Sequence, residues 1–308
     1  MVNNKKWERL FCPQATPIRK LKNFKNVEVN IKRDDLNHKI IQGNKLRKLK
    51  YNIKYAIESG FTQVATFGGA HSNHIVATAQ AAHLTGMKSI GFIRGDELQN
   101  NKEKWSKTLF QANEIGMDLV FLDRDSYKLK EVSPNVRDYL AKLTYYPYII
   151  PEGGSNNLAL QGVVEIIDEL VNQMPEATHI VTACGTGGTM AGLIDGIAKY
   201  DWHAKVIGIP VLKGAKFLKE EIKLFSHNHD SVNWQLYYNY HAGGFAKLDE
   251  ITEGFAKKFT QMSSIFLDRV YTAKSFFAAY DLIRRGEIPA HSSLIILHTG
   301  GLQGGVIR

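Results

Sequence analysis

The hydrophobic positions follow two alternating patterns along most of the chain. Short runs rich in Val, Ile and Leu, bounded by glycine or polar turns, predict β-strands. The predicted strands are Val29–Lys32, Gln63–Phe67, Ser89–Ile93, Leu119–Leu122, Tyr148–Ile150, Ile180–Thr182, Lys205–Ile209 and Leu294–Leu297. Between them, helical spacing predicts helices that begin near Lys45, Ser72, Lys102, Pro134, Asn156, Gly188, Leu248 and Ala273. Such alternation is typical of an α/β fold with parallel sheets covered by helices.

The length of the chain indicates more than one domain. At 308 residues and 44% hydrophobic, it exceeds the roughly 250–300 residues at which single cores stop growing, so two domains are expected. Residues Leu212–Asn239 have the least regular pattern. They are helical at first and then aromatic and irregular through Trp234-Gln235-Leu236-Tyr237-Tyr238.

Glycine-rich turns follow several of the predicted strands. They are Gly68–His74, Pro151–Asn156, Gly185–Thr189 and Thr299–Gly301. Ligands of open α/β sheets bind outside the carboxyl ends of the strands, where these turns should lie. The turns therefore predict a ligand site.

Lys45 stands at the start of a predicted amphipathic helix, directly after the Gly43-Asn44 turn. We expect its ammonium to face the positive end of the helix dipole, close to Arg47 and Lys48, and both effects favour a neutral amine. A neutral amine is a nucleophile that can form a Schiff base with an aldehyde cofactor. Taken alone, however, the segment is more typical of a solvated lysine in a basic stretch.

The turn Gly185-Thr186-Gly187-Gly188-Thr189 joins a buried strand to a helix. Its glycines let the backbone approach an anion, the first amides of the helix are free donors, and the threonine hydroxyls can add hydrogen bonds to phosphate oxygens. Neither the Walker spacing nor the dinucleotide-binding fingerprint fits it. The alternative is a tight turn that uses glycine for steric reasons alone.

The turn that ends in Ser72-Asn73-His74 carries consecutive polar side chains. Ser72 or Asn73 could cap the following helix, but so many polar groups favour a loop that holds a substrate carboxylate and a cofactor hydroxyl. A zinc site built on His71, His74 and His83 is the rival hypothesis. No further cluster has metal-ligand spacing, so no metal is expected.

Two hydroxyl residues complete the set of candidates. Tyr271 precedes a predicted helix and, alone, is most simply explained as a tyrosine packed on the core. Thr299 ends a buried strand just before Gly300-Gly301, and its neutral hydroxyl could bond a ring nitrogen at the edge of the sheet.

The net charge of +9 is confined to one segment of the chain. Residues 1–54 hold 15 Lys and Arg against 4 Asp and Glu, a net +11, and the other 254 residues hold 24 against 26, a net −2. This segment includes the strand-like stretch Val27–Ile31 and lacks interleaved aromatics, so an anionic cofactor or substrate is favoured over nucleic acid. The sequence has two cysteines and no long apolar run or secretory signal, which predicts a cytoplasmic protein that does not enter membranes.

Seven blocks in order resemble the family of 1-aminocyclopropane-1-carboxylate deaminases and D-cysteine desulfhydrases, from about residue 13 to the end of the chain. The blocks are Lys32–Leu36, Gly43–Leu49, Gly69–His74, Pro151–Asn156, Gly185–Thr189, Val270–Lys274 and His298–Gly301. The resemblance implies pyridoxal phosphate as cofactor. It also implies the tryptophan synthase β-subunit type of fold (fold type II), with two open, mostly parallel, twisted sheets flanked by helices. On this basis we expect residues 1–52 and 157–308 to form a large cofactor-binding domain and residues 53–156 a small one.

The same resemblance assigns roles to the candidate residues. Lys45 would form the Schiff base, Asn73 would bond the phenolic oxygen, and Thr299 would lie near the pyridine nitrogen. The loop Gly185–Thr189, helped by Lys48, would hold the phosphate. In the cofactor-binding set we also place Asn44, Gly185, Thr186, Gly187, Gly188 and Thr189. Ser72, Asn73, His74 and Tyr271 would face a small amino-acid substrate, with Lys45, Ser72 and Tyr271 as the catalytic groups.

Two positions bear on the choice of substrate. Family members that open the cyclopropane ring look as if they need Glu after the tyrosine and Leu before the paired glycines, whereas this chain has Thr272 and Thr299. A neutral partner leaves the ring less electron-withdrawing, which suits a good leaving group such as thiolate. We therefore expect α,β-elimination from D-cysteine or a related β-substituted amino acid, giving pyruvate, ammonia and sulfide. Deamination of 1-aminocyclopropane-1-carboxylate to 2-oxobutanoate and ammonia is the alternative, and a basic anion- or nucleic-acid-binding protein is the non-enzymatic one.

The chain departs from the family pattern at two places. His71 stands where the family often has Gln, and the tail after Gly301 lacks the usual Pro and the helix that follows it. Both departures bear on the substrate and leave the predicted fold and cofactor intact. The resemblance further suggests a homodimer.

Overall fold

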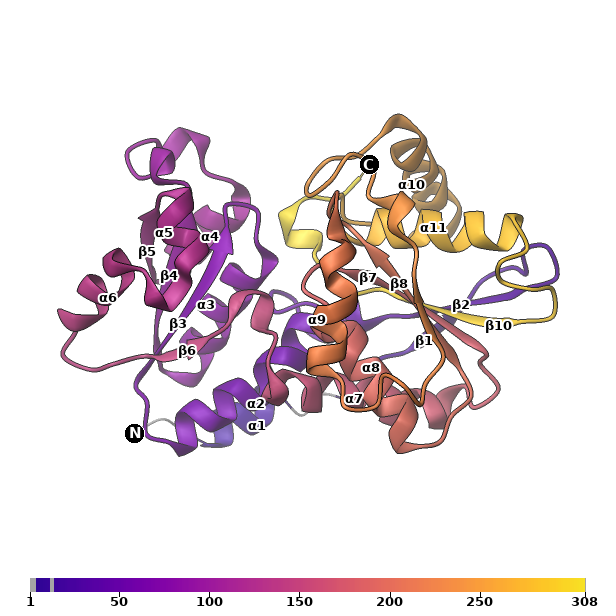
Figure 1. The fold of residues 1–308 in the computed structure, drawn as a ribbon, viewed down its shortest axis with the longest axis horizontal. Coiled ribbons are helices and arrows are strands. Elements are labelled where there is room, and N and C mark those ends of the chain that lie inside the picture. Colours follow the sequence, from indigo (N-terminus) through magenta and orange to yellow (C-terminus); the bar gives the residue numbers. More distant parts are fainter. Residues whose placement is uncertain (1–3, 12–13, 308) are drawn as a thin grey trace.

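Two separate sheets organise the chain in the computed structural model, which describes residues 4–11 and 14–307 (Figure 1). The larger sheet has six strands in the order β1-β2-β10-β7-β8-β9. Its strands are β1 (Ile18–Lys20), β2 (Glu28–Lys32), β7 (His179–Cys184), β8 (Lys205–Pro210), β9 (Trp234–Leu236) and β10 (Ser293–Leu297). Only the β1–β2 pair is antiparallel among these neighbours. We call this part of the molecule the large lobe.

The smaller sheet has four strands, all parallel, in the order β5-β4-β3-β6. Its strands are β3 (Gln63–Gly69), β4 (Lys88–Arg94), β5 (Met117–Leu122) and β6 (Tyr148–Ile150). Together with its helices this sheet forms the small lobe, on the left in Figure 1. The predicted fold class is confirmed, because both sheets are mostly parallel and flanked by helices.

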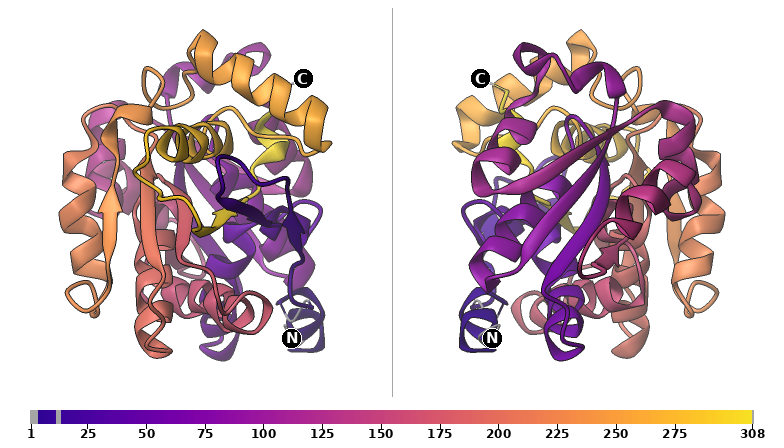
Figure 2. Two further views of the ribbon diagram at one scale, coloured as in Figure 1. Left: turned by 90° about the vertical axis from the view of Figure 1, so that its right-hand side faces the viewer. Right: turned by 90° about the vertical axis from the view of Figure 1, so that its left-hand side faces the viewer.

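Helices cover the faces of both sheets. In chain order they are α1 (Asn4–Phe11), α2 (Asn44–Glu58), α3 (Asn73–Thr85), α4 (Lys107–Ile115), α5 (Arg124–Leu129), α6 (Pro134–Ala141), α7 (Asn157–Gln173), α8 (Gly188–Lys199), α9 (Leu218–Phe225), α10 (Glu250–Ser263) and α11 (Thr272–Arg284). Figures 1 and 2 place α10 and α11 above the large sheet and α7 and α8 below it. The central strands are therefore buried on both faces, which explains their uninterrupted apolar sequences.

The elements that the sequence did not predict are short. Strands β1 and β9 have three residues each, and both lie at edges of the large sheet. Helix α5 has six residues and is capped by Asp123. The helix expected near Lys102 begins at Lys107 instead, because Lys102–Lys104 form a separate 3-10 turn and Ser106 caps α4. Elements this short bury too few residues to produce a recognisable period.

Helix α2 connects the two lobes. Leu49 and Ile53 on its apolar stripe are fully buried in a cluster with Val64 and Ile150 of the small sheet. Its opposite side packs so closely on α7 that a Cβ at Gly162 would lie 1.9 Å from the carbonyl oxygen of Arg47. The predicted domain boundary at 52/53 falls inside this shared helix, and the division into domains remains a prediction, as does the homodimer.

A buried network of charges fixes α2 to the large lobe. The guanidinium of Arg47 contacts Asp34 at 2.9 Å and Glu169 of α7 at 2.6 Å. Lys32, at the end of β2 and fully buried, donates to Glu169 at 2.5 Å and to the carbonyl of Thr16 at 2.7 Å. Since buried charges are tolerated only when they are paired, this network determines where the first turn of α2 can lie.

The basic residues of segment 1–54 do not form a single exposed surface. Lys32, Arg47 and Lys48 are buried, and Arg33 pairs with Asp35 at 2.7 Å. Much of the excess charge is therefore used inside the fold. Within residues 4–11 and 14–307, no helix combines the length and apolarity needed to cross a membrane.

Replacement of Arg47 by Met should destabilise the protein by about 3–5 kcal/mol, because the buried Asp34 would keep, among the described residues, a hydrogen bond only from the Thr16 hydroxyl. Urea unfolding followed by circular dichroism measures this change. Lys54→Met on the same helix is the control, since Lys54 is half exposed, lies 3.9 Å from Glu58 and has its ammonium 5.4 Å from the centre of the Trp7 ring. Equal unfolding free energies for the two variants would contradict the role assigned to the network.

Candidate functional site

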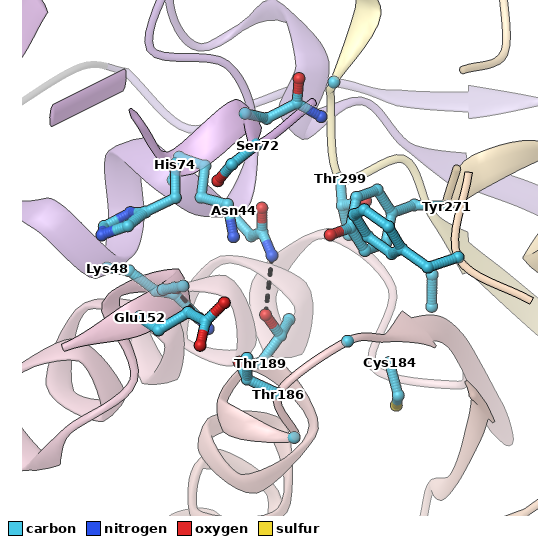
Figure 3. Close-up of a pocket in the computed structure, with 18 of the residues that line it drawn as sticks. Asn44, Lys48, Ser72, His74, Glu152, Cys184, Thr186, Thr189, Tyr271 and Thr299 are labelled. Carbon is cyan, nitrogen blue, oxygen red and sulfur yellow. Dashed lines mark hydrogen bonds between the residues drawn. The ribbon is translucent and has the colours of Figure 1, made fainter. Parts of the chain in front are cut away.

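A cavity of about 240 Å³ lies where turns that follow strands of both sheets meet (Figure 3). It brings together twelve of the thirteen residues predicted from the sequence: Asn44, Lys45, Lys48, Ser72, Asn73, His74, Gly185, Thr186, Gly187, Thr189, Tyr271 and Thr299. Gly188, the thirteenth, begins α8 and does not line the cavity. A Cβ there would lie 2.6 Å from Ser155 Oγ and 3.0 Å from Lys48 Nζ, so its place in the turn demands glycine.

Lys45 lies in the first turn of α2 and lines the cavity. The turn docks on the end of β10: Asn44 N donates to the carbonyl of Thr299, and a Cβ at Gly43 would lie only 1.9 Å from that oxygen. With φ of +63°, Gly43 is also in a conformation that L-residues rarely adopt. This close contact sets the position of Lys45 relative to Thr299.

The pKa of Lys45 is lowered to about 8 by burial. This corrects the sequence argument, which attributed a neutral amine to the helix dipole and to nearby Arg47 and Lys48. Arg47 contacts Asp34 and Glu169 instead, and burial is the cause. Among the described residues, Lys45 Nζ has no hydrogen-bond or ion-pair partner, so a neutral amine is available to react.

Lys48 lies one turn further along α2, beside the glycine loop. Its Nζ donates to Ser155 Oγ at 2.8 Å and to the carbonyl of Gly153 at 3.2 Å, and the hydroxyls of Ser155 and Thr186 are 2.6 Å apart. Burial, followed by the charge of Lys45, lowers the pKa of Lys48 well below the ordinary lysine value. A bound anion would reverse that effect, because a negative charge stabilises the ammonium.

The glycine loop presents the start of α8 to the cavity. Gly187 has φ of +80°, and the first amides of the helix have no intrahelical acceptor. Thr189 Oγ1 accepts a hydrogen bond of 2.8 Å from Asn44 Nδ2, which ties this loop to α2 (Figure 3). The arrangement is that of an anion site, with backbone donors on one side and Lys48 on the other.

Ser72 and Asn73 begin α3 from the small lobe. Ser72 occupies the N-cap position, but its side chain accepts no capping hydrogen bond, contrary to the simpler capping hypothesis, so the hydroxyl is free to act in the cavity. Asn73 is buried, its Oδ1 has no partner, and its Nδ2 lies against Gly301, where a Cβ would be 2.8 Å away. A buried amide with one end unsatisfied indicates a missing hydrogen-bonding group.

His74 belongs to α3, and its side chain lies deeper, against the Pro151–Asn156 turn. Thr66 Oγ1 donates to the carbonyl of Ile150, so His74 Nε2 donates to Thr66 and Nδ1 is an acceptor without a partner. Burial, then the charges of Lys45 and Lys48, lowers the pKa of His74 well below the ordinary value, which keeps the ring neutral. Within the described residues, no group of three or more His, Cys, Asp or Glu side chains could hold a metal ion.

Tyr271 projects into the cavity from the start of α11, next to Gly185, where a Cβ would lie 3.2 Å from its ring. Burial, with smaller contributions from Asp268 and Glu152, raises the pKa of its phenol, so the phenol is protonated at neutral pH. Thr272, which the substrate argument also used, does not line the cavity. It is fully buried, and its hydroxyl donates to Asp268 Oδ1 at 2.7 Å.

Several lining residues were not assigned a role from the sequence. They include Arg94, Glu152, Cys184, Met190, Leu212 and Phe245. Arg94 is the last residue of β4 and directly follows the predicted strand Ser89–Ile93, so its position at the carboxyl end of a strand could have identified it as a lining residue. Glu152 belongs to a noted turn and is held by Tyr127 at 2.5 Å and Lys130 at 2.8 Å. Leu212 and Phe245 come from irregular segments whose sequence gives no signal.

Comparison with known proteins identifies the family of the chain. The family model described as pyridoxal-phosphate dependent enzyme matches residues 11–300. The chain belongs to this family. It is therefore a pyridoxal-phosphate-dependent enzyme, which confirms the predicted enzyme class and cofactor.

Individual relatives carry two activity names. The chain is 31% identical to the mitochondrial bifunctional D-cysteine desulfhydrase/1-aminocyclopropane-1-carboxylate deaminase of Arabidopsis thaliana, over 90% of this chain and 73% of the relative. It is 30% identical to a D-cysteine desulfhydrase of Klebsiella pneumoniae, over 89% and 87%. A solved structure of an ACC deaminase homologue superposes with a TM-score of 0.84 at 30% identity, over 97% and 95%. The predicted resemblance is confirmed at the level of this group.

The residues of the cavity fit pyridoxal phosphate. Lys45 supplies an unpartnered amine for the aldehyde carbon, and the Gly185–Thr189 loop with Lys48 supplies an anion site for the phosphate. The side-chain amide of Asn73, whose Nδ2 can donate a hydrogen bond, suits the phenolic oxygen. The hydroxyl of Thr299, at the end of β10, suits the ring nitrogen. Each polar end of the cofactor thus has a candidate partner.

In the apoenzyme, Lys45 should react with acetic anhydride at a rate that rises with pH around a midpoint near 8, because only the neutral amine is a nucleophile and burial lowers its pKa to about 8. Competitive labelling followed by mass spectrometry of the peptides measures this midpoint. Lys199 is the internal control, since a hydrogen bond from its ammonium to Asp168 raises its pKa above the ordinary value. A Lys45 midpoint as high as that of Lys199 would contradict the assignment.

Proposed function

We propose that this enzyme catalyses α,β-elimination from D-cysteine or a related β-substituted amino acid, releasing pyruvate, ammonia and sulfide. The observation that carries the proposal is the neutral edge of the cavity at Thr299. Among the described lining residues, the only carboxylate is Glu152, which lies on the opposite side in Figure 3 and is held by Lys130 and Tyr127. A ring nitrogen beside a neutral hydroxyl is a weaker electron sink, which suits a substrate with a good leaving group.

We assign the following roles in the elimination to the residues around the cavity. Ser72 and the amides at the start of α3 bind the substrate carboxylate. Lys45, neutral above a pH of about 8, removes the proton from the α-carbon. Tyr271, whose phenol is protonated, delivers a proton to the departing sulfur. Pyridoxal phosphate, when bound, takes up the electron pair left on the α-carbon.

The alternative is deamination of 1-aminocyclopropane-1-carboxylate to 2-oxobutanoate and ammonia. Relatives at about 30% identity carry both names, and His71 stands where the family often has Gln. Breaking an unactivated C–C bond demands a stronger electron sink than expelling a thiolate. The neutral Thr299 edge therefore favours elimination.

D-Cysteine should be consumed much faster than 1-aminocyclopropane-1-carboxylate, with pyruvate and sulfide as products. Coupled assays for pyruvate and 2-oxobutanoate, run across D- and L-amino acids, measure this preference. Faster release of 2-oxobutanoate would show that the argument from Thr299 is wrong.

Lys45→Ala should lose activity by about 10²–10⁴-fold, the range expected from removal of a general base alone. It should also lose the cofactor adduct that borohydride reduction fixes on Lys45. Lys54→Ala is the matched control on the same helix, because its side chain is exposed outside the cavity. Protein that stays colourless with added pyridoxal phosphate and yields no Lys45 adduct would contradict the enzymatic assignment. A salt-dependent shift of oligonucleotides would then support the anion-binding alternative.

Tyr271→Phe should reduce elimination of D-cysteine by about 10²-fold or more while leaving elimination of β-chloro-D-alanine nearly unchanged, because chloride departs without a proton. Pyruvate release from the two substrates by one preparation gives the ratio directly. Equal losses for both substrates would mean that Tyr271 binds or packs and does not protonate the leaving group.

A further inference from the structure

Lys274 is a fully buried lysine on α11 that the proposed chemistry does not use. Among the described residues it forms no ion pair. Its ammonium donates to the carbonyl of Gly244 at 2.7 Å and to the carbonyl of Val211 at 3.3 Å. Burial lowers its pKa to about 8, against the opposing effects of Asp268 and Asp249. A buried ammonium satisfied only by backbone carbonyls is costly, so its presence calls for a reason.

The two carbonyls belong to two loops that we call the wall loops, residues 211–214 and 242–246. The first follows β8 and the second precedes α10. Leu212 and Phe245, the residues that directly follow the bonded carbonyls, both line the cavity. Lys274 therefore joins, through a single ammonium, the two backbone segments that supply the apolar part of the wall.

The second wall loop has an unfavourable backbone conformation. Ala242 and Ala246 have φ of +49° and +57°, and Gly243 and Gly244 between them have φ of +91° and +120°. Non-glycine residues adopt this region at a cost of roughly 1–2 kcal/mol each, and such strain persists only where neighbouring groups hold it. The hydrogen bond from Lys274 to Gly244 is one of the contacts that hold the loop.

The wall also contacts a proposed catalytic group. Phe245 packs edge-on against the ring of Tyr271, with 6.2 Å between ring centroids and 76° between ring planes. Tyr271 and Lys274 lie one turn apart on the same helix start. The wall therefore lies beside the group assigned to the departing sulfur, where the β-substituent of the substrate must fit.

We propose that Lys274 is a positioning residue that fastens Leu212 and Phe245 into a rigid apolar wall, and that this wall limits the size of the β-substituent that the enzyme accepts. The inference rests on the proposed elimination and adds its substrate class: β-substituted amino acids with a compact leaving group. Larger thioethers do not fit beside the wall, although the same elimination could act on them.

The test compares D-cysteine with S-benzyl-D-cysteine on the holoenzyme of wild type and Lys274→Met. Both substrates lose a thiol, sulfide or benzyl thiol, and both leave pyruvate and ammonia after water is added, so one pyruvate assay serves for both. The ratio of the two kcat/KM values is independent of the fraction of active enzyme, and a general loss of stability leaves it unchanged. In Lys274→Met it should move at least about tenfold toward the benzyl substrate, the scale on which pockets discriminate size.

A second readout does not depend on turnover. Lys213 lies in the first wall loop, Lys247 directly follows the second, and both are exposed. Trypsin should therefore cut after them several-fold faster in Lys274→Met than in wild type, with or without cofactor. Lys257→Met on α10 is the control, because its side chain is half exposed and lies outside the cavity.

Phe245→Ala keeps the proposal testable if Lys274→Met does not fold, because it trims the wall and leaves the buried lysine in place. It should shift the substrate ratio in the same direction. An unchanged ratio in Phe245→Ala would overturn the role of the wall, and unchanged ratio and cleavage in a folded Lys274→Met would overturn the role of the lysine. If wild type releases pyruvate from neither substrate, the proposed elimination fails, while the tryptic comparison still decides whether Lys274 fastens the loops.

Discussion

The ion pairs between Arg47 and the carboxylates of Asp34 and Glu169 are the interaction on which the site depends. They join the segment after β2 and the start of α2, which are close in sequence, to α7, which is far from both along the chain. Lys45 and Lys48, the residues proposed to react with the aldehyde and to bind the phosphate of the cofactor, lie on the same helical turn as Arg47. Arg47 therefore locates both ends of the cofactor site without touching the cavity.

The electrostatics of the cavity explain why it suits an anionic ligand. Among the described residues, Lys45 and Lys48 face it without a carboxylate partner; burial disfavours the charged form of both, and the charge of Lys45 further disfavours that of Lys48. The single lining carboxylate among the described residues, Glu152, is held by Lys130 and Tyr127. This excess of positive charge in the cavity lowers the stability of the protein, and a bound phosphate would offset it. The requirement for an anion is thus a property of the fold, independent of which amino acid is processed.

The sequence predicted those features that local patterns encode. Buried parallel strands are continuous apolar runs, so most of the large sheet was expected, and the glycine turns that follow the strands supply more than half of the residues that line the cavity. Contacts set by tertiary docking could not be predicted in this way. The pKa of Lys45 is governed by burial, Thr272 turns inward to Asp268, and Leu212 and Phe245 reach the cavity from irregular loops. The sequence pattern of such loops does not tell which of their side chains will point into the cavity.

The contact between Gly43 and the carbonyl of Thr299 has a consequence for how such an enzyme can change over evolution. It places Lys45, the lysine proposed to react with the cofactor, next to the turn that carries Thr299, whose hydroxyl is proposed to face the ring nitrogen. The separation of these two residues is set by a backbone contact in which the small lobe takes no part. Changes of substrate that leave the electron demand on the ring unaltered can therefore arise outside this contact, in the α3 turn of the small lobe and the loops beside Tyr271. The residues that hold the cofactor can then stay unchanged while the residues around the substrate vary.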